Sequence, residues 1–161
     1  MDAEVGQGSK GAAARLELET FMPYRLNVLA TVVSQGLARI YAERYGIGIP
    51  EWRVMATLGQ FGSLTAKDIG AHSRMHKTKV SRAVAILEER GLVRRRANRQ
   101  DLREAFLSLT APGRAIYDDL VPVALTFAAS LTEGLTAAER TALDSLIGKL
   151  TARGLQLLGD G

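Results

Sequence analysis

The chain has 161 residues, 47% of them hydrophobic and 24% charged, which is typical of a folded globular protein and too apolar for a disordered one. It contains no cysteine, so disulfide frameworks, thiol catalysis and zinc–thiolate sites are excluded. The net charge of +4 does not by itself indicate a partner. No segment approaches about 20 consecutive apolar residues, and the acidic start does not resemble a signal peptide. We therefore expect a cytoplasmic protein that does not contact a membrane.

The positive charge is concentrated in one part of the chain. Residues 74–103 contain ten basic and three acidic side chains and so carry +7, whereas the remaining residues together carry −3. A solvated charged face would also contain basic residues, but the acidic remainder makes this concentration unusual. The distribution favours a surface that binds a polyanion.

The beginning of the chain predicts a tail followed by a long helix. Residues 1–20 start with a polar segment rich in glycine and alanine, which favours disorder. A helix is expected to begin near Pro23, because proline suits a first turn and apolar residues then recur at steps of three and four. The helix is expected to end at Gly46 or Gly48.

Three shorter helices follow. The first is expected to open at Pro50 and to close at Gly62. Thr65 and Asp68 approximate a capping box that starts a short second helix. A third helix is expected over residues 76–90, and the tight turn before it completes a helix-turn-helix.

The second half of the chain predicts a hairpin and two further helices. Residues 92–97 and 104–109 are expected to pair as strands across a polar turn, because apolar residues alternate in the second segment. Thr110 caps the next helix, which Pro122 should kink, and a capping box at Thr136 starts the last helix. The last helix carries an apolar stripe of Leu143, Leu146, Ile147 and Leu150.

Helix 76–90 has two different faces. Its apolar side chains fall within one narrow arc, whereas the opposite face is short, hydroxylated and basic. Such a helix can pack on one side and enter the major groove with the other, where Arg82 can bind guanine through two hydrogen bonds. Acidic residues occur only at its far end, so the positive end of the helix dipole is available to phosphate. The DNA contacts expected here are His76, Lys77, Thr78, Lys79, Ser81 and Arg82.

The hairpin places further arginines beside this helix. Three consecutive arginines occupy residues 94–96, and two more flank the turn. Next to a helix that enters a groove, this density favours contact with phosphate or with the minor groove. Asp101 is expected to pair with Arg103 and so to hold the shape of the turn. The DNA contacts expected here are Arg95, Arg96, Arg99 and Arg103.

Five segments, in their order and spacing, resemble the MarR family of transcriptional regulators. They are EWRV at 51–54, TKVSRAV at 78–84, LEERGLV at 87–93, DLR at 101–103 and LTAPGR at 109–114. The likeness covers about residues 23–150. It implies a mainly α fold with a small β-hairpin wing, in which a winged helix-turn-helix domain is joined to a helical dimerisation region.

The resemblance also implies domain boundaries and a function. The DNA-binding domain is expected over residues 50–110, and the dimerisation region over 21–48 and 111–158. The expected function is that of a homodimeric repressor of transcription, released from double-stranded DNA by a small ligand held between the two regions. A two-fold dimer places its recognition helices about 34 Å apart, which predicts a pseudopalindromic operator.

The effector is expected to be aromatic. Ligands of the family are often phenolic acids, and residues 23–28 and 51–53 resemble the branch that senses aromatic CoA thioesters. Arginines near these segments can pair with a ligand carboxylate or stay solvated. The candidate ligand-binding residues are Asn27, Tyr41, Trp52 and Met55, with core packing as the alternative role of Trp52 and Met55.

Neither an enzyme nor a metal site is predicted, and no cofactor is expected. Adjacent carboxylates at 88–89 and 118–119 point about 100° apart on a helix, so they do not form an acid–base pair. His72 and His76 are four residues apart, but the turn between them breaks the helical face and a third ligand is not evident. The alternative to a ligand-responsive regulator is an architectural DNA-binding protein, which would lack a pocket and a ligand response.

Overall fold

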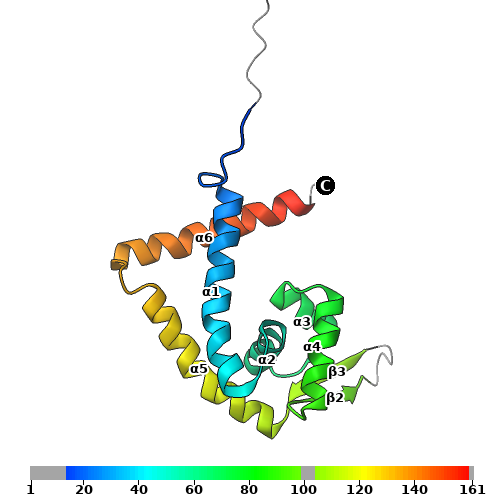
Figure 1. The fold of residues 1–161 in the computed structure, drawn as a ribbon. Helices are drawn as coiled ribbons and strands as arrows, with labels where there is room; N and C mark the ends of the chain where they lie inside the picture. Colours follow the sequence, from blue (N-terminus) through cyan, green and yellow to red (C-terminus); the bar gives the residue numbers. More distant parts are fainter. Residues whose placement is uncertain (1–13, 99–103, 160–161) are drawn as a thin grey trace, which may run out of the picture. The chain divides into compact units, whose positions relative to one another are not determined.

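The computed structural model describes residues 14–98 and 104–159. The chain forms two compact units, residues 1–36 and 37–161. Within the described ranges, no helix combines the length and apolar character needed to span a bilayer. The elements follow one another in the order (Figure 1) α1 (Met22–Tyr45), α2 (Ile49–Phe61), β1 (Leu64–Thr65), α3 (Ala66–Ser73), α4 (Lys77–Glu89), β2 (Val93–Ala97), β3 (Ala105–Leu109), α5 (Ala111–Leu131) and α6 (Ala137–Gly159).

The described part of the first unit consists of a short turn and the beginning of α1. The helix starts one residue before Pro23, as its sequence predicts. Most large apolar side chains of this unit are exposed, so it buries little apolar surface of its own. The exposed side chains are Leu16, Leu18, Phe21, Met22, Tyr24, Leu26, Val28, Leu29 and Val32.

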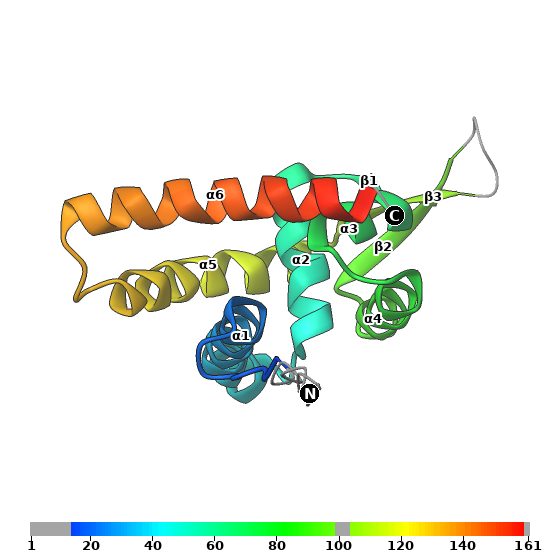
Figure 2. The same cartoon turned by 90° about the horizontal axis from the view of Figure 1, so that it is seen from above.

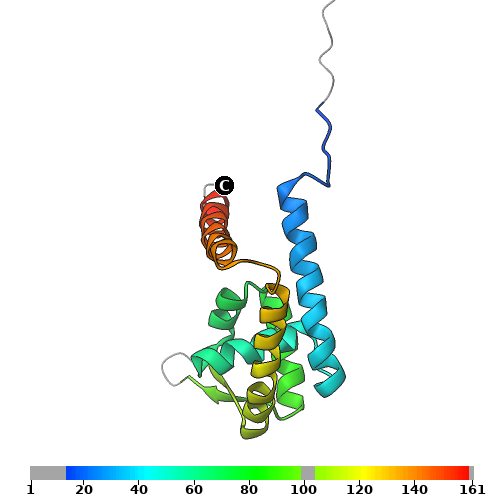
Figure 3. The same cartoon turned by 90° about the vertical axis from the view of Figure 1, so that its left-hand side faces the viewer.

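The core of the second unit lies among α2, α3, α4 and the sheet. Helix α2 begins after Gly48 with Pro50 in its first turn and ends at Gly62, which confirms the predicted bounds. Its neighbours α4 and α5 pack against it (Figure 3). The four apolar positions predicted for the inner face of α4 are all buried, namely Val80, Ala83, Val84 and Leu87. The core includes Val54, Met55, Leu58, Ile69, Val80, Ala83, Val84, Leu87 and Leu107.

The sheet has one strand more than the sequence predicts. Strands β2 and β3 form the expected antiparallel hairpin, with Arg95 opposite Leu107. The additional strand β1 pairs with the other edge of β3, so the order is β1-β3-β2. A two-residue strand carries no alternating pattern, and in the sequence Thr65 indicates only a helix cap.

Thr110 joins the hairpin to α5. Its hydroxyl donates to the Gly91 carbonyl (2.6 Å) and accepts from the backbone N–H of Gly113 (3.1 Å), which confirms the predicted cap. A β-carbon at Gly113 would overlap the Leu92 carbonyl oxygen, so only glycine allows α5 to start this close to the hairpin.

Helices α5 and α6 leave much of their apolar surface exposed. Helix α5 runs through Pro122 as a single helix. Thr136 and Glu139 form the predicted capping box at the start of α6, with Glu139 accepting from the Thr136 backbone at 2.7 Å. Every described α6 residue is exposed. The predicted stripe of Leu143, Leu146, Ile147 and Leu150 is therefore exposed in the described structure.

The capping box at α3 gives a stability prediction. Thr65 accepts from the Asp68 N–H (3.2 Å), while the Asp68 carboxylate accepts from the Thr65 hydroxyl (2.7 Å) and N–H (3.2 Å). We expect Thr65→Ala to lower the free energy of unfolding by about 1 kcal/mol at pH 7. Urea titration measures this loss. Ser63→Ala, at an exposed neighbour, is the control and should change stability by less than about 0.5 kcal/mol.

The same box predicts a pH dependence. Hydrogen bonds from the side chain and then the backbone of Thr65 lower the pKa of Asp68. A lowered pKa in the folded state means that the stabilisation is present above the unfolded value of about 4 and is lost as the pH falls below it. The difference between wild type and Thr65→Ala should therefore shrink at pH 3. An equal difference at pH 7 and pH 3 would show that the carboxylate takes no part.

Candidate nucleic-acid interface

The turn before α4 fixes where this helix begins. His76 is its N-cap, and its Nδ1 accepts from the backbone N–H of Thr78 (3.3 Å). Arg74 closes α3 in the left-handed conformation (φ 54°), which allows the chain to turn within three residues. His76 is exposed, so its ring remains accessible at the start of α4 while one nitrogen caps the helix.

The outer face of α4 is exposed and basic. Lys77, Lys79 and Arg82 are exposed together with the hydroxyls of Thr78 and Ser81. Within the described part of the chain, the three cations make no hydrogen bond or ion pair. Five of the residues predicted to contact DNA are thereby brought together on one helical face. Their free charges and hydroxyls can bind phosphates and base edges.

The hairpin arginines have different environments. The Arg94 Nε donates to the Ser108 hydroxyl (3.1 Å), and Arg95 forms an ion pair with Glu88 (3.0 Å). Arg96 is exposed and has no partner among the described residues. The predicted contacts Arg99 and Arg103, and the predicted pair of Arg103 with Asp101, lie outside the described residues.

Arg90 belongs to the basic block but has a different role. Its guanidinium donates to the carbonyls of Tyr45 (2.6 Å) and Gly46 (3.1 Å), where α1 ends. A cation at this position satisfies unpaired carbonyls and complements the helix dipole. The Tyr45 hydroxyl in turn donates to Asp119 of α5 (2.8 Å). The +7 block therefore includes an arginine that joins the end of α4 to the end of α1, which Tyr45 joins to α5.

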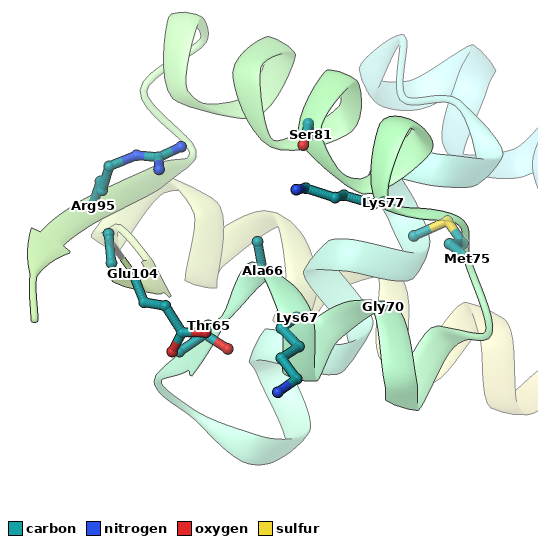
Figure 4. A pocket seen from close by; sticks show the side chains of 10 residues that line it. Thr65, Ala66, Lys67, Gly70, Met75, Lys77, Ser81, Arg95 and Glu104 are labelled. Carbon is teal, nitrogen blue, oxygen red and sulfur yellow. The ribbon is translucent and has the colours of Figure 1, made fainter. Parts of the chain in front are cut away.

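A cavity of about 480 Å³ opens between the start of α3, the first half of α4 and the hairpin. Figure 4 shows Lys77 and Ser81 of α4 and Arg95 of β2 around it. Its lining contains three cations and one carboxylate, so the local charge is positive. The residues are Thr65, Ala66, Lys67, Gly70, Met75, Lys77, Ser81, Arg95, Glu104 and Ala105.

The candidate ligand residues occupy different environments. Tyr41 is buried, which raises the pKa of its hydroxyl, and its ring stacks on Trp52 with 5.6 Å between centroids. Met55 is fully buried in the core, which fits the packing role that was its alternative. Asn27 lies in the first unit and is exposed, and its carbonyl accepts from the Thr31 hydroxyl (2.8 Å).

Sequence reasoning missed a third member of the aromatic stack. The ring of Tyr117 in α5 lies 6.3 Å from the ring of Trp52, measured between centroids. The guanidinium carbon of Arg114 lies over the Tyr117 ring, 5.2 Å from its centroid. No short-range pattern joins residues so far apart in sequence. The helical stripe of α5 indicates only that Tyr117 faces inward.

The two histidines make different contacts. The His72 ring stacks on Phe61, with 4.2 Å between centroids, and His76 caps α4. Over the described ranges, no three metal-ligating side chains come together.

Comparisons with known proteins agree with this geometry. Residues 47–105 match the model of the MarR family. The chain is 26% identical over 123 residues to YwoH, an uncharacterized HTH-type transcriptional regulator of Bacillus subtilis (strain 168), covering 76% of this chain and 88% of that protein. It is similar to a MarR/EmrR family transcriptional regulator from Acinetobacter sp. ADP1, with a TM-score of 0.80, 26% identity and coverage of 88% and 99%.

Two solved structures at lower identity share the fold. Sco3205, a MarR family regulator from Streptomyces coelicolor solved in complex with DNA, has a TM-score of 0.77 and 23% identity, with coverage of 91% and 93%. Bordetella bronchiseptica BpsR, whose DNA binding is regulated by 6-hydroxynicotinic acid, has a TM-score of 0.75 and 20% identity, with coverage of 86% and 98%. The matched model spans the helix-turn-helix and most of the wing, and the fold likeness extends to the flanking helices. The chain is therefore similar to the MarR family of transcriptional regulators, which are DNA-binding proteins and not enzymes.

Proposed function

We propose that this protein is a homodimeric repressor that binds a pseudopalindromic operator and is released by a small aromatic ligand. The observation that carries the proposal is the outer face of α4, where cations and hydroxyls are exposed and where the cations have no partner among the described residues. Such a face can enter the major groove without first breaking internal ion pairs. The cytoplasm is the expected compartment, because the DNA of a regulator lies there.

Each side chain on this face has a proposed role. Arg82 reads a guanine, and Lys77 and Lys79 contact phosphates or base edges. Thr78 and Ser81 donate to either. Arg96 and the segment 99–103 reach the minor groove or the phosphates beside it, as the wing of the resembled family does. His76, at the start of α4, contacts the sugar–phosphate backbone of the DNA.

The dimerisation region is proposed to comprise residues 21–48 and 111–158, with residues 50–110 as the DNA-binding domain and 1–20 as a tail. The proposal is supported by the leucine and isoleucine stripe on α6, which is exposed in the described structure. Its exposed fractions lie between 39% and 55%. A contiguous apolar stripe of this kind marks a contact with another chain, and a two-fold copy supplies the same stripe in return.

The effector is proposed to be a phenolic acid or an aromatic CoA thioester. Support comes from the stack of Tyr41, Trp52 and Tyr117, since aromatic faces bind an aromatic ring by offset stacking. BpsR, a protein of the same fold, is regulated in its DNA binding by an aromatic acid, 6-hydroxynicotinic acid. Asn27 remains a proposed contact, and Met55 is proposed to support the stack from the core.

A thermal-shift series tests the effector and separates it from the architectural alternative. Salicylate, 6-hydroxynicotinate and benzoyl-CoA are the probes, and a ligand that binds only the folded protein raises its melting temperature. Trp52 is the single tryptophan of the chain, so its fluorescence should change with the same dissociation constant. The ligand that binds should also release DNA. If no compound in a wider set of aromatic acids raises the melting temperature, the architectural DNA-binding protein is favoured.

Selection from a random duplex library tests operator binding. The full chain should enrich a sequence with two inverted half-sites whose centres lie about one helical turn apart. Affinity should fall steeply with salt, because each phosphate contact releases a counterion. Equal binding of all duplexes would contradict the regulator, and a single half-site would contradict the dimer.

A further inference from the structure

A two-pronged ion pair joins the end of α4 to the middle of β2. Arg95 donates from Nε to one oxygen of Glu88 and from Nη2 to the other, both at 3.0 Å. The hydrogen bonds to Glu88 raise the pKa of Arg95, so the guanidinium stays charged. Two parallel bonds fix the relative orientation of the two side chains as well as their separation.

The pair lies where the wing has little other support. Of the five β2 residues only Val93 is buried, so the strand leaves the core immediately after it. Strand β2 contacts α4, and in Figure 2 the two long strands extend outward from the helices. Arg94 bonds to Ser108 within the sheet, whereas the bond from Arg95 is the one that reaches α4. Among described side chains, it is the polar link between the recognition helix and the exposed part of β2.

The same pair limits what Arg95 can do on DNA. Two donors of its guanidinium are already bound to a carboxylate, and the negative charge of Glu88 offsets its positive charge. If Arg95 turned to a phosphate, Glu88 would lose its partner close to a polyanion. The neighbouring Arg96 has no such partner among the residues that the structure describes, and it can contact phosphate at lower cost.

We infer that Glu88 and Arg95 form a clamp that holds the wing at a fixed angle to α4, and that Arg95 acts on DNA binding as a positioning residue. The inference rests on the proposed function and replaces the expectation that Arg95 itself contacts DNA. Breaking the clamp lets the wing leave the orientation that fits the duplex. The apparent affinity is then the intrinsic affinity multiplied by the fraction of molecules that keep that orientation.

Neutralising two adjacent glutamates tests the clamp through the sign of the effect. Both Glu88→Gln and Glu89→Gln remove one negative charge near DNA, so electrostatics alone predicts tighter binding for both. Glu89 is exposed and has no partner in the described part of the chain, which makes it the matched control. The clamp predicts about fivefold weaker binding for Glu88→Gln, measured by anisotropy on the selected duplex and on a random 30-bp duplex. Tighter binding of both variants would overturn the inference.

A charge swap and a salt titration separate positioning from contact. Glu88→Arg and Arg95→Glu should each weaken binding, and the double variant E88R/R95E should recover most of the loss. Arg95→Gln should leave the slope of log K against log salt nearly unchanged, whereas Arg96→Gln should lower it by about one. A swap without recovery, or equal slope changes, would show that Arg95 touches phosphate.

Thermal unfolding of the free protein distinguishes the failure of the clamp from that of the proposed function. The wild type, the two single charge variants and the double variant E88R/R95E form a double-mutant cycle, which should show a favourable coupling between Glu88 and Arg95 without DNA. If the coupling is present and no duplex binds, the regulator is wrong and the ion pair is only structural. If DNA binds and the coupling is absent, the clamp is wrong and the regulator stands.

Discussion

Arg82→Ala is expected to weaken binding to the selected operator by about fivefold to 150-fold, because one bidentate contact to guanine is worth about 1–3 kcal/mol. Arg82 lies on the exposed face of α4 and has no partner in the described structure. Its removal therefore leaves no buried group unpaired. The loss measured on DNA should report the contact itself, and the melting temperature should stay unchanged.

The comparison of two duplexes identifies the kind of contact. If Arg82 reads a base, Arg82→Ala should bind the selected and the scrambled duplex with more similar affinity than wild type, and renewed selection should relax one position in each half-site. Arg39→Ala removes the same charge from an exposed position of α1, and it should change both affinities little. Equal losses on both duplexes would assign Arg82 to phosphate.

Helix bounds could be predicted because the signals that set them are local. Proline at the start of α2, the boxes at Thr65 and Thr136, and the cap at Thr110 each act within four residues. The two faces of α4 follow from the same periodicity, since four apolar positions in one arc must point to the core. The residues expected to face DNA are those of α4 that lie outside this apolar arc.

The roles of individual arginines could not be predicted, because they depend on partners distant in sequence. Arg90 bonds to carbonyls 44 and 45 residues away, and the pairing of Arg95 with Glu88 needs the angle at which β2 leaves α4. The short strand β1 exists only because β3 offers it an edge. Tyr117 joins the aromatic stack through the packing of α5 on α2. Charge counting located the surface, and tertiary structure decides which charges remain free on it.

We expect the double variant L146D/L150D to convert the proposed dimer into monomers at about 10 μM. Each leucine buried in an interface contributes about 1.5–3 kcal/mol, and a two-fold axis counts each substitution twice. Four carboxylates would also be brought into the apolar contact, so the dissociation constant should rise at least about a hundredfold. Sedimentation velocity measures the change directly.

The matched control for this prediction lies on the same helix. Ser145 is exposed and faces away from the stripe, so Ser145→Asp adds the same charge without entering the interface and should leave the dimer intact. Because every described α6 residue is exposed within the chain, the double variant should keep its helical content, and circular dichroism checks this. The monomer should lose the preference for two half-sites over one while keeping the effect of Arg82→Ala on a single half-site. A double variant that remains dimeric would place the dimer contact on another surface.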